Sequence, residues 1–335
     1  MSCVEVIKQG IKSVNRNWQL VLVQFASTFI GFMSFCIIVG VPIAIAFILF
    51  GLDLTEILKS RDTLEVLGNS ASLLKKYFAA AVIILLSLLG YLTFLVTLWT
   101  FTVSGTIGVF ADSILSSESS FSLGSFIRHG RKYFMPVMFF SVLIGGIFMV
   151  IAFALGVLGG VAASIIETAK SREIAFALFL GVFFMLTLGV AFIFLILGTF
   201  SATIYGMAFL VFNKASSIEA LKGSFRYLHS TPSAAGFYAV LMFSYGLALF
   251  LVLLIGSPIA VIPLIGPPLS MMYQLIVYFV QAYIGLVLIS SAFIYYYNTS
   301  GLANEGEKDS HAPADPLPEE VSIGTDSMET DGSEK

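Results

Sequence analysis

The stretch SSIEALKGSFRYLHSTPSAAGFYAVLMF, residues 216–243, joins a charged helical segment to a long apolar one. In its first half, apolar side chains recur at helical intervals and leave Glu219, Lys222 and Arg226 on a polar face. Ser216 followed by Glu219 predicts a capping box at the start of this helix. A proline then separates the helix from an uncharged run long enough to enter a membrane. An amphipathic helix directly before such a run is typical of a segment that lies in the membrane interface.

The same arrangement occurs at two other places in the chain. Apolar residues at offsets 0, 3, 7 and 10 form one stripe of a helix, with a single glycine as exception. These positions are Val4, Ile7, Ile11 and Val14; Leu123, Phe126, Gly130 and Tyr133; and Ile218, Leu221, Phe225 and Leu228. The residue at offset 8 is basic in all three segments, as Lys12, Arg131 and Arg226.

The shared basic position lies at the edge of the apolar stripe, where a long side chain can reach lipid phosphate. We therefore expect Lys12, Arg131 and Arg226 to contact anionic lipid headgroups. The alternative is that they form weak surface ion pairs with Glu5, Glu219 or acidic residues of the tail. The repeat itself also has an alternative explanation, because loops between spans are often basic and amphipathic.

The composition identifies the class of protein. Of the 335 residues, 58% are hydrophobic and 11% charged, whereas soluble domains carry about 25% charged residues. A transmembrane β-barrel would show alternating segments of about 10 residues, and the sequence has none. The sequence therefore predicts an all-α polytopic membrane helix bundle, surrounded by lipid and without a nucleic-acid partner.

Stretches free of Asp, Glu, Lys and Arg set the number of spans, because one crossing needs about 20 apolar residues. Prolines between residues 255 and 268 cannot continue a helix and divide the last such stretch into two crossings. Gly40–Pro42 predicts a kink or an end in the first crossing. The six predicted spans are roughly 18–42, 80–108, 135–162, 176–206, 234–256 and 270–297.

Spans and interfacial segments together predict three units within a membrane domain of residues 1–298. Each unit is an interfacial helix followed by a two-span hairpin, over about 4–111, 122–213 and 216–298. Residues 299–335 hold ten acidic residues and two lysines, a net charge of −8, and this composition predicts a disordered acidic tail.

Basic residues predict the orientation in the membrane. The N-terminus, the second and fourth connections and the tail together hold 11 Lys and Arg, against 6 on the opposite side. Since positive residues stay on the cytoplasmic side, we expect both termini in the cytoplasm. If the organism is prokaryotic, the protein is expected in the plasma (inner) membrane.

Uncharged polar residues inside the spans suggest either helix contacts or a path. No Asp, Glu, Lys or Arg lies in a predicted span, which argues against ion-coupled pumps and voltage sensors. Gln274 and Gln281 share one face of the sixth span, and Thr93 and Thr97 lie along the second. They predict hydrogen bonds between helices or, alternatively, a polar path for an uncharged or amphipathic ligand.

A stripe of small residues recurs every fourth position in the third span. Its members are Ala152, Gly156, Gly160 and Ser164. Small residues at this spacing let another helix approach closely, so the stripe predicts helix packing within the bundle or against a second subunit.

No catalytic motif is recognised in the sequence. The three histidines are His129, His229 and His311, and a metal pair of His229 with Glu219 lacks further ligands. Neither a G-x-S-x-G elbow nor a phosphate-binding loop occurs. We therefore expect no metal or cofactor, and nothing argues for an enzyme.

The segment EALKGSFRYLHSTPSAAGFY resembles a signature that precedes a pair of spans in a loose bacterial and archaeal group. The resemblance is carried by Ala220, Leu221, Lys222, Ser224, Phe225 and Arg226. The group includes the membrane domain of some glycerophosphodiester phosphodiesterases and several uncharacterised six-span families. The resemblance implies a six-helix bundle, and it implies no hydrolase activity, since the catalytic barrel is missing.

These observations lead to a functional hypothesis with alternatives. The sequence favours a non-enzymatic membrane protein with an organising, lipid-interacting or accessory role, with a second copy or another membrane protein as a further partner. The main alternative is a passive transporter or permease component for an uncharged or amphipathic solute. A membrane lipid enzyme is a third possibility.

Overall fold

The computed structural model describes residues 2–50, 70–116, 120–171, 173–256, 258 and 266–302. Within these ranges every regular secondary-structure element is a helix, and six helices are long and apolar enough to cross a membrane. The chain divides into two units, Met1–Tyr296 and Tyr297–Lys335, and the description below concerns the first. The structure thus confirms an all-α, multi-pass membrane protein. The predicted tail beyond residue 302 and most of the predicted proline turn lie outside the described residues.

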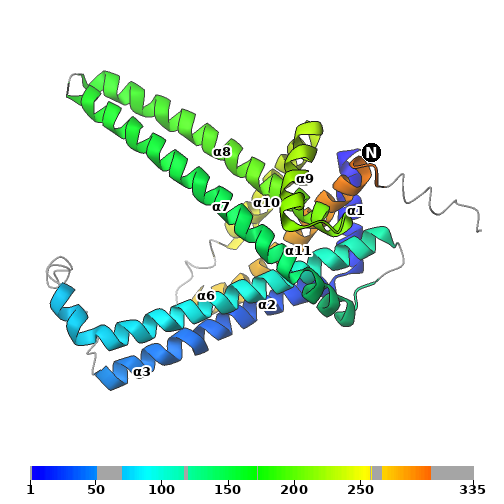
Figure 1. The fold of residues 1–335 in the computed structure, drawn as a ribbon, viewed down its shortest axis with the longest axis horizontal. Coiled ribbons are helices and arrows are strands. Elements are labelled where there is room, and N and C mark those ends of the chain that lie inside the picture. The colour runs from blue at the N-terminus through cyan, green and yellow to red at the C-terminus, as the bar shows by residue number, and fades with distance from the viewer. Residues whose placement is uncertain are drawn as a thin grey trace, which may run out of the picture. The chain divides into compact units, whose positions relative to one another are not determined.

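The helices follow one another along the chain (Figure 1). Their bounds are α1 Cys3–Arg16, α2 Gln19–Phe35, the π-helical η1 Cys36–Gly40, α3 Val41–Phe50, α6 Ser70–Leu115, α7 Leu123–Lys170, α8 Ile174–Phe212, α9 Ser217–Ser230, α10 Pro232–Gly256 and α11 Gly266–Thr299. The membrane-crossing segments are Gln19–Ala46, Ala81–Leu115, Leu123–Lys170, Ile174–Phe212, Pro232–Gly256 and Leu269–Thr299. All six predicted spans are found, with several of them longer than predicted.

The first span passes through Gly40–Pro42 without ending there. A π-helical turn, Cys36–Gly40, comes directly before Pro42, and α3 continues the helix to Phe50. Proline has no N–H to donate to the preceding turn, so a regular α-helical ladder cannot run through it. The wider π turn is a common way for a helix to absorb such an interruption.

The second interfacial segment is not a separate helix, contrary to the prediction. Helix α7 begins at Leu123 and runs without a break through Pro136 to Lys170. In contrast, the turn at Asn17–Trp18 separates α1 from α2, and Thr231 separates α9 from α10. A single proline removes only one backbone hydrogen bond, and here the helix tolerates that loss.

Small residues let the first helix of each predicted unit meet the second span of another unit. A Cβ added to Gly10 of α1 would lie 3.1 Å from both the Cβ and the backbone N of Ser291 in α11. A Cβ added to Gly108 of α6 would collide with His129 of α7, and one added to Gly206 of α8 would lie 3.4 Å from Ser224 Cβ in α9. The three interfacial segments therefore contact α11, α6 and α8 in turn.

The buried core gathers at the end of the bundle where these contacts occur. The last turns of α6 and α8 are almost continuously buried, and α7 has no buried residue between Ile144 and Ala162. Farther from this end α7 packs along α8, and α6 along α2 and α3, as antiparallel pairs (Figure 1). Their outward side chains are apolar, as expected for surfaces in contact with lipid.

Candidate functional site: a basic face and an intramembrane cavity

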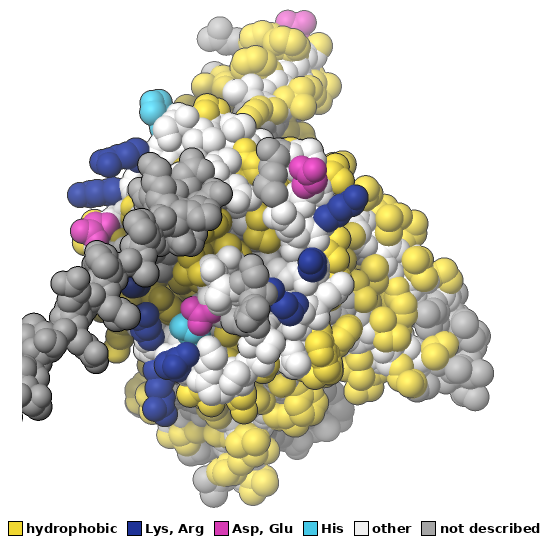
Figure 2. Space-filling view, turned by 90° about the vertical axis from the view of Figure 1, so that its right-hand side faces the viewer, with side chains coloured by type: hydrophobic (Ala, Val, Ile, Leu, Met, Phe, Trp, Pro, Cys, Tyr) yellow, Lys and Arg dark blue, Asp and Glu magenta, His cyan; other side chains and the backbone are white. Residues whose placement is uncertain are grey.

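Basic side chains gather on the side of the molecule where α1 and α9 lie. Figure 2 shows dark-blue Lys and Arg side chains spread over this side, and we call it the basic face. It includes Lys12 of α1, Arg131 of α7 and Arg226 of α9, and all three are exposed. The three predicted headgroup contacts thus lie on helices at one end of the bundle, and the contact with lipid stays a prediction.

Two carboxylates near these cations are already engaged in helix caps. Glu5 Oε2 accepts a hydrogen bond of 2.9 Å from the backbone N–H of Ser2, and Glu219 Oε2 accepts one of 2.9 Å from that of Ser216. Both helices carry complete capping boxes, so the predicted box at Ser216 is confirmed. These hydrogen bonds lower the pKa of both carboxyl groups. Neither carboxylate forms an ion pair with a described basic residue.

The predicted apolar stripe faces outward in two of the three segments. In α9, Ile218 is 59% and Phe225 48% exposed, which fits a stripe turned toward the membrane interface. In α1, Val4 and Ile11 are exposed, whereas Val14 at the end of the stripe is fully buried. In α7, however, Phe126, Gly130 and Tyr133 are buried, so most of this stripe packs against protein. Phe126 stacks edge-on against Phe101 of α6 at 6.0 Å between ring centroids, which accounts for its burial.

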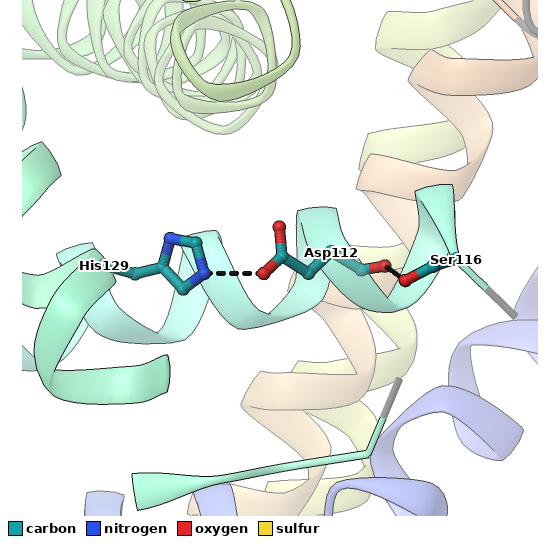
Figure 3. A network of polar contacts seen from close by, with 3 residues as sticks. All are labelled: Asp112, Ser116 and His129. Carbon is teal, nitrogen blue, oxygen red and sulfur yellow. Dashed lines mark hydrogen bonds and ion pairs between the residues drawn. The ribbon is translucent and has the colours of Figure 1, made fainter. Parts of the chain in front are cut away.

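A histidine–aspartate pair fastens α7 to the end of α6 (Figure 3). The Nε2–H of His129 donates to Asp112 Oδ2 at 2.6 Å, since a carboxylate only accepts. His129 is buried, whereas the side chain of Asp112 is 43% exposed. This is the sole ion pair among the described residues, and it joins two consecutive helices.

A second polar contact fastens the turn between α1 and α2 to the same end of α6. Arg16 Nη2 donates to the backbone carbonyl of Ser113 at 2.6 Å. The fully buried Asn17 donates through Nδ2 to Ser13 O at 2.9 Å and to Ser113 Oγ at 3.1 Å. The sequence analysis missed both this contact and the His129–Asp112 pair, because no spacing pattern links residues 17 or 97 positions apart.

Side chains of α2, α6, α8, α10 and α11 line a cavity of about 370 Å³. Amides and hydroxyl groups line part of its wall, and apolar side chains form the remainder. The polar residues that line it are Gln24, Thr28, Thr106, Tyr245, Tyr278 and Gln281. A second hollow of about 570 Å³ lies between α2 and α6 and shares Gln24, Thr28 and Trp99 with the first.

The cavity includes one of the four predicted polar residues. Gln281 lines it, whereas Gln274, Thr93 and Thr97 line neither hollow. Thr93 Oγ1 donates to Leu89 O at 2.9 Å and Thr97 Oγ1 to Thr93 O at 2.8 Å, so both hydroxyls bond within their own helix. Gln24, another uncharged polar residue of the first predicted span, lines both hollows.

The small-residue stripe of α7 lies on an outward surface of this unit. Ala152, Gly156, Gly160 and Ser164 are all exposed, and a Cβ added to either glycine would meet nothing within 4 Å. Ser164 lines a small hollow together with Phe176 and Leu180 of α8, and the role of the stripe in helix packing stays a prediction.

Metal-binding groups do not cluster in the part of the chain that the structure describes. No three His, Cys, Asp or Glu side chains come close enough there to hold an ion. Comparison with known proteins gives no match to any family model, curated protein or solved structure.

Proposed function

We propose that the protein is a lipid-interacting, organising or accessory membrane protein without enzymatic activity, whose basic face binds anionic headgroups at the cytoplasmic surface. The observation that carries the proposal is the gathering of exposed basic residues from α1, α7 and α9 at one end of the bundle (Figure 2). The two nearest capping carboxylates are held by Ser2 and Ser216, which leaves the cations available to phosphate. Both termini lie in the cytoplasm under this proposal, as the distribution of basic residues favours.

The expected strength follows from the charge count. A basic residue near an anionic leaflet contributes about 1 kcal/mol, so Lys12, Arg131 and Arg226 contribute about 3 kcal/mol if they act independently. That sum corresponds to roughly a hundredfold in affinity.

The test compares the Lys12→Gln/Arg131→Gln/Arg226→Gln variant with the wild type by native mass spectrometry, using phosphatidylglycerol and phosphatidylcholine. The matched control, Lys75→Gln/Lys76→Gln/Lys170→Gln, removes the same charge near the opposite ends of the spans. The basic-face variant should retain far less phosphatidylglycerol, and the control should resemble the wild type. Equal retention by both variants would show that the headgroup role is wrong.

The alternative, a passive transporter or permease component for an uncharged or amphipathic solute, has one observation in its favour. Gln281 lines the cavity between α2, α6, α8, α10 and α11. A polar path along the predicted face would also require Gln274, Thr93 and Thr97, and none of these lines the cavity. We therefore prefer the lipid-interacting role.

A further inference from the structure

We propose that the cavity binds the head of an uncharged, single-chain amphiphile, of the class of monoacylglycerols and long-chain alcohols, whose chain lies in the hollow between α2 and α6. This inference goes beyond headgroup binding at the basic face, because it concerns a different site and a ligand without charge.

Polar groups in the cavity wall call for a hydrogen-bonding partner. Among the described residues, the amides of Gln24 and Gln281 and the hydroxyls of Tyr245 and Tyr278 make no side-chain hydrogen bond. Gln281 and Tyr278 are exposed and Gln24 and Tyr245 half-buried, so a bound molecule can reach their polar atoms. In a membrane such groups are normally paired. A ligand hydroxyl both donates and accepts, and it can therefore pair with either end of a glutamine amide.

The wall of both hollows determines the charge of the ligand. Among the described residues, neither the cavity nor the adjoining hollow is lined by Asp, Glu, Lys, Arg or His. A carboxylate or phosphate head would thus lie in a low-dielectric site without a counter-charge, which is strongly unfavourable. The site therefore selects a neutral head over a fatty acid or a phospholipid.

The adjoining hollow fits one hydrocarbon chain. Its α6 wall extends from Tyr91 to Thr102, a distance of about 16 Å at 1.5 Å per residue. Phe32, Phe35 and Leu95 supply apolar surface along it. Gly31 faces this hollow, and a Cβ added there would lie 3.5 Å from Leu95 Cδ1, so the glycine leaves the space open. The two hollows meet at Gln24, Thr28 and Trp99, where head and chain would join.

Trp99 provides a built-in reporter, because the chain contains only two tryptophans and Trp99 lines both hollows. Trp18 lines neither hollow, so Trp18→Phe leaves a single fluorophore at the site. The protein, reconstituted in phosphatidylcholine vesicles, is titrated with a monoacylglycerol brominated on its chain, at low mole fraction. Bromine quenches tryptophan on contact, so occupancy of the hollow appears as quenching that saturates.

Two variants of the site and one control distinguish binding in the hollow from random collisions with lipid in the bilayer. Gln24→Leu/Gln281→Leu should raise the concentration for half-maximal quenching about tenfold, through the loss of two hydrogen bonds. Gly31→Leu should remove saturable quenching by filling the hollow between α2 and α6. The matched control is Gly146→Leu, at an exposed glycine of α7 with nothing within 4 Å, and it should leave the titration unchanged.

Brominated fatty acid, phosphatidylcholine and diacylglycerol complete the test. The proposal expects saturable quenching by the monoacylglycerol alone, weakened in the paired Gln→Leu variant and lost in Gly31→Leu. Equal quenching by all four lipids, or quenching that the paired Gln→Leu variant leaves unchanged, would overturn it. Stronger binding of diacylglycerol would overturn the single-chain assignment. None of these outcomes depends on the basic residues, so failure here is distinguishable from failure of the headgroup proposal.

Discussion

The contact between α1 and α11 joins the two ends of the membrane domain and makes a sharp prediction for Gly10→Ala. Gly10 is buried, and an added Cβ would collide with Ser291 Oγ and lie 3.1 Å from both Ser291 Cβ and its backbone N. The hydroxyl can rotate away, whereas the backbone and Cβ of α11 cannot move without shifting the helix. Helix α1 must therefore be displaced from α11 by a few tenths of an ångström.

Two opposing effects determine how much Gly10→Ala changes the free energy of unfolding. Overpacking a tight contact costs about 1–3 kcal/mol. Alanine stabilises a helix interior by about 1 kcal/mol relative to glycine, and this gain offsets part of the destabilisation. Gly124→Ala in the first turn of α7 corrects for the gain, because its Cβ would meet Ser122 Oγ at an ordinary 3.6 Å. Relative to this control, Gly10→Ala should lower the free energy of unfolding by about 1–3 kcal/mol.

The assay is equilibrium unfolding in mixed micelles, read by fluorescence, for both single variants. Ser291→Gly removes the side chain that the new methyl group meets, so Gly10→Ala/Ser291→Gly should recover most of the difference as a positive coupling. If Gly10→Ala is as stable as Gly124→Ala, or if Ser291→Gly gives no rescue, α1 does not close on α11 as described.

Four further predictions concern the ion pair between α6 and α7, the cap of α9, the titration of Glu219 and the orientation of the chain. Asp112→Ala should lower the free energy of unfolding by about 1–3 kcal/mol, because it leaves Nε2 of the buried His129 unpaired, and Asp112→Asn should cost less; thermal unfolding measures both. Ser216→Ala should cost about 1 kcal/mol through loss of the α9 cap. Hydrogen bonds from Ser216 lower the pKa of Glu219 below its ordinary 4.5. Its contribution to stability is therefore complete above pH 4.5 and is lost as the pH falls through the lowered pKa. Helix content should fall between pH 7 and pH 3 more in the wild type than in Glu219→Gln. A reporter fused to the C-terminus should be found in the cytoplasm, and a periplasmic or extracellular signal would contradict the proposed orientation.

Sequence patterns predicted what depends on local chemistry. Uncharged stretches located all six spans, because hydrocarbon tolerates no unpaired charge and this requirement is visible along the chain. The capping box at Ser216 and Glu219 was likewise predictable, since both partners lie three residues apart. The same patterns misplaced the break before the third span, where α7 continues through Pro136.

Contacts between distant residues left no periodic trace in the sequence. Asn17 meets Ser113, and His129 meets Asp112, only because the chain folds back on itself. Gln24 of α2 and Gln281 of α11 line the same cavity although 257 positions separate them along the chain. The prediction selected Gln281 by its spacing from Gln274, and this spacing on one helix says nothing about the facing helix.

The arrangement of the core explains why the cavity lies where it does. In lipid, apolar side chains gain little by packing together, so close backbone approach and hydrogen bonds hold helices in contact. Here such contacts concentrate at the basic face, where Gly10, Gly108 and Gly206 admit neighbouring helices and Asp112 binds His129. Beyond this end, glycines such as Gly146 and Gly189 meet nothing within 4 Å, and lipid rather than protein covers the helices. The polar hollow at Gln24 and Gln281 lies between the closely packed end of the bundle and the part that lipid covers. A neutral amphiphile can therefore enter it from the membrane without opening the core.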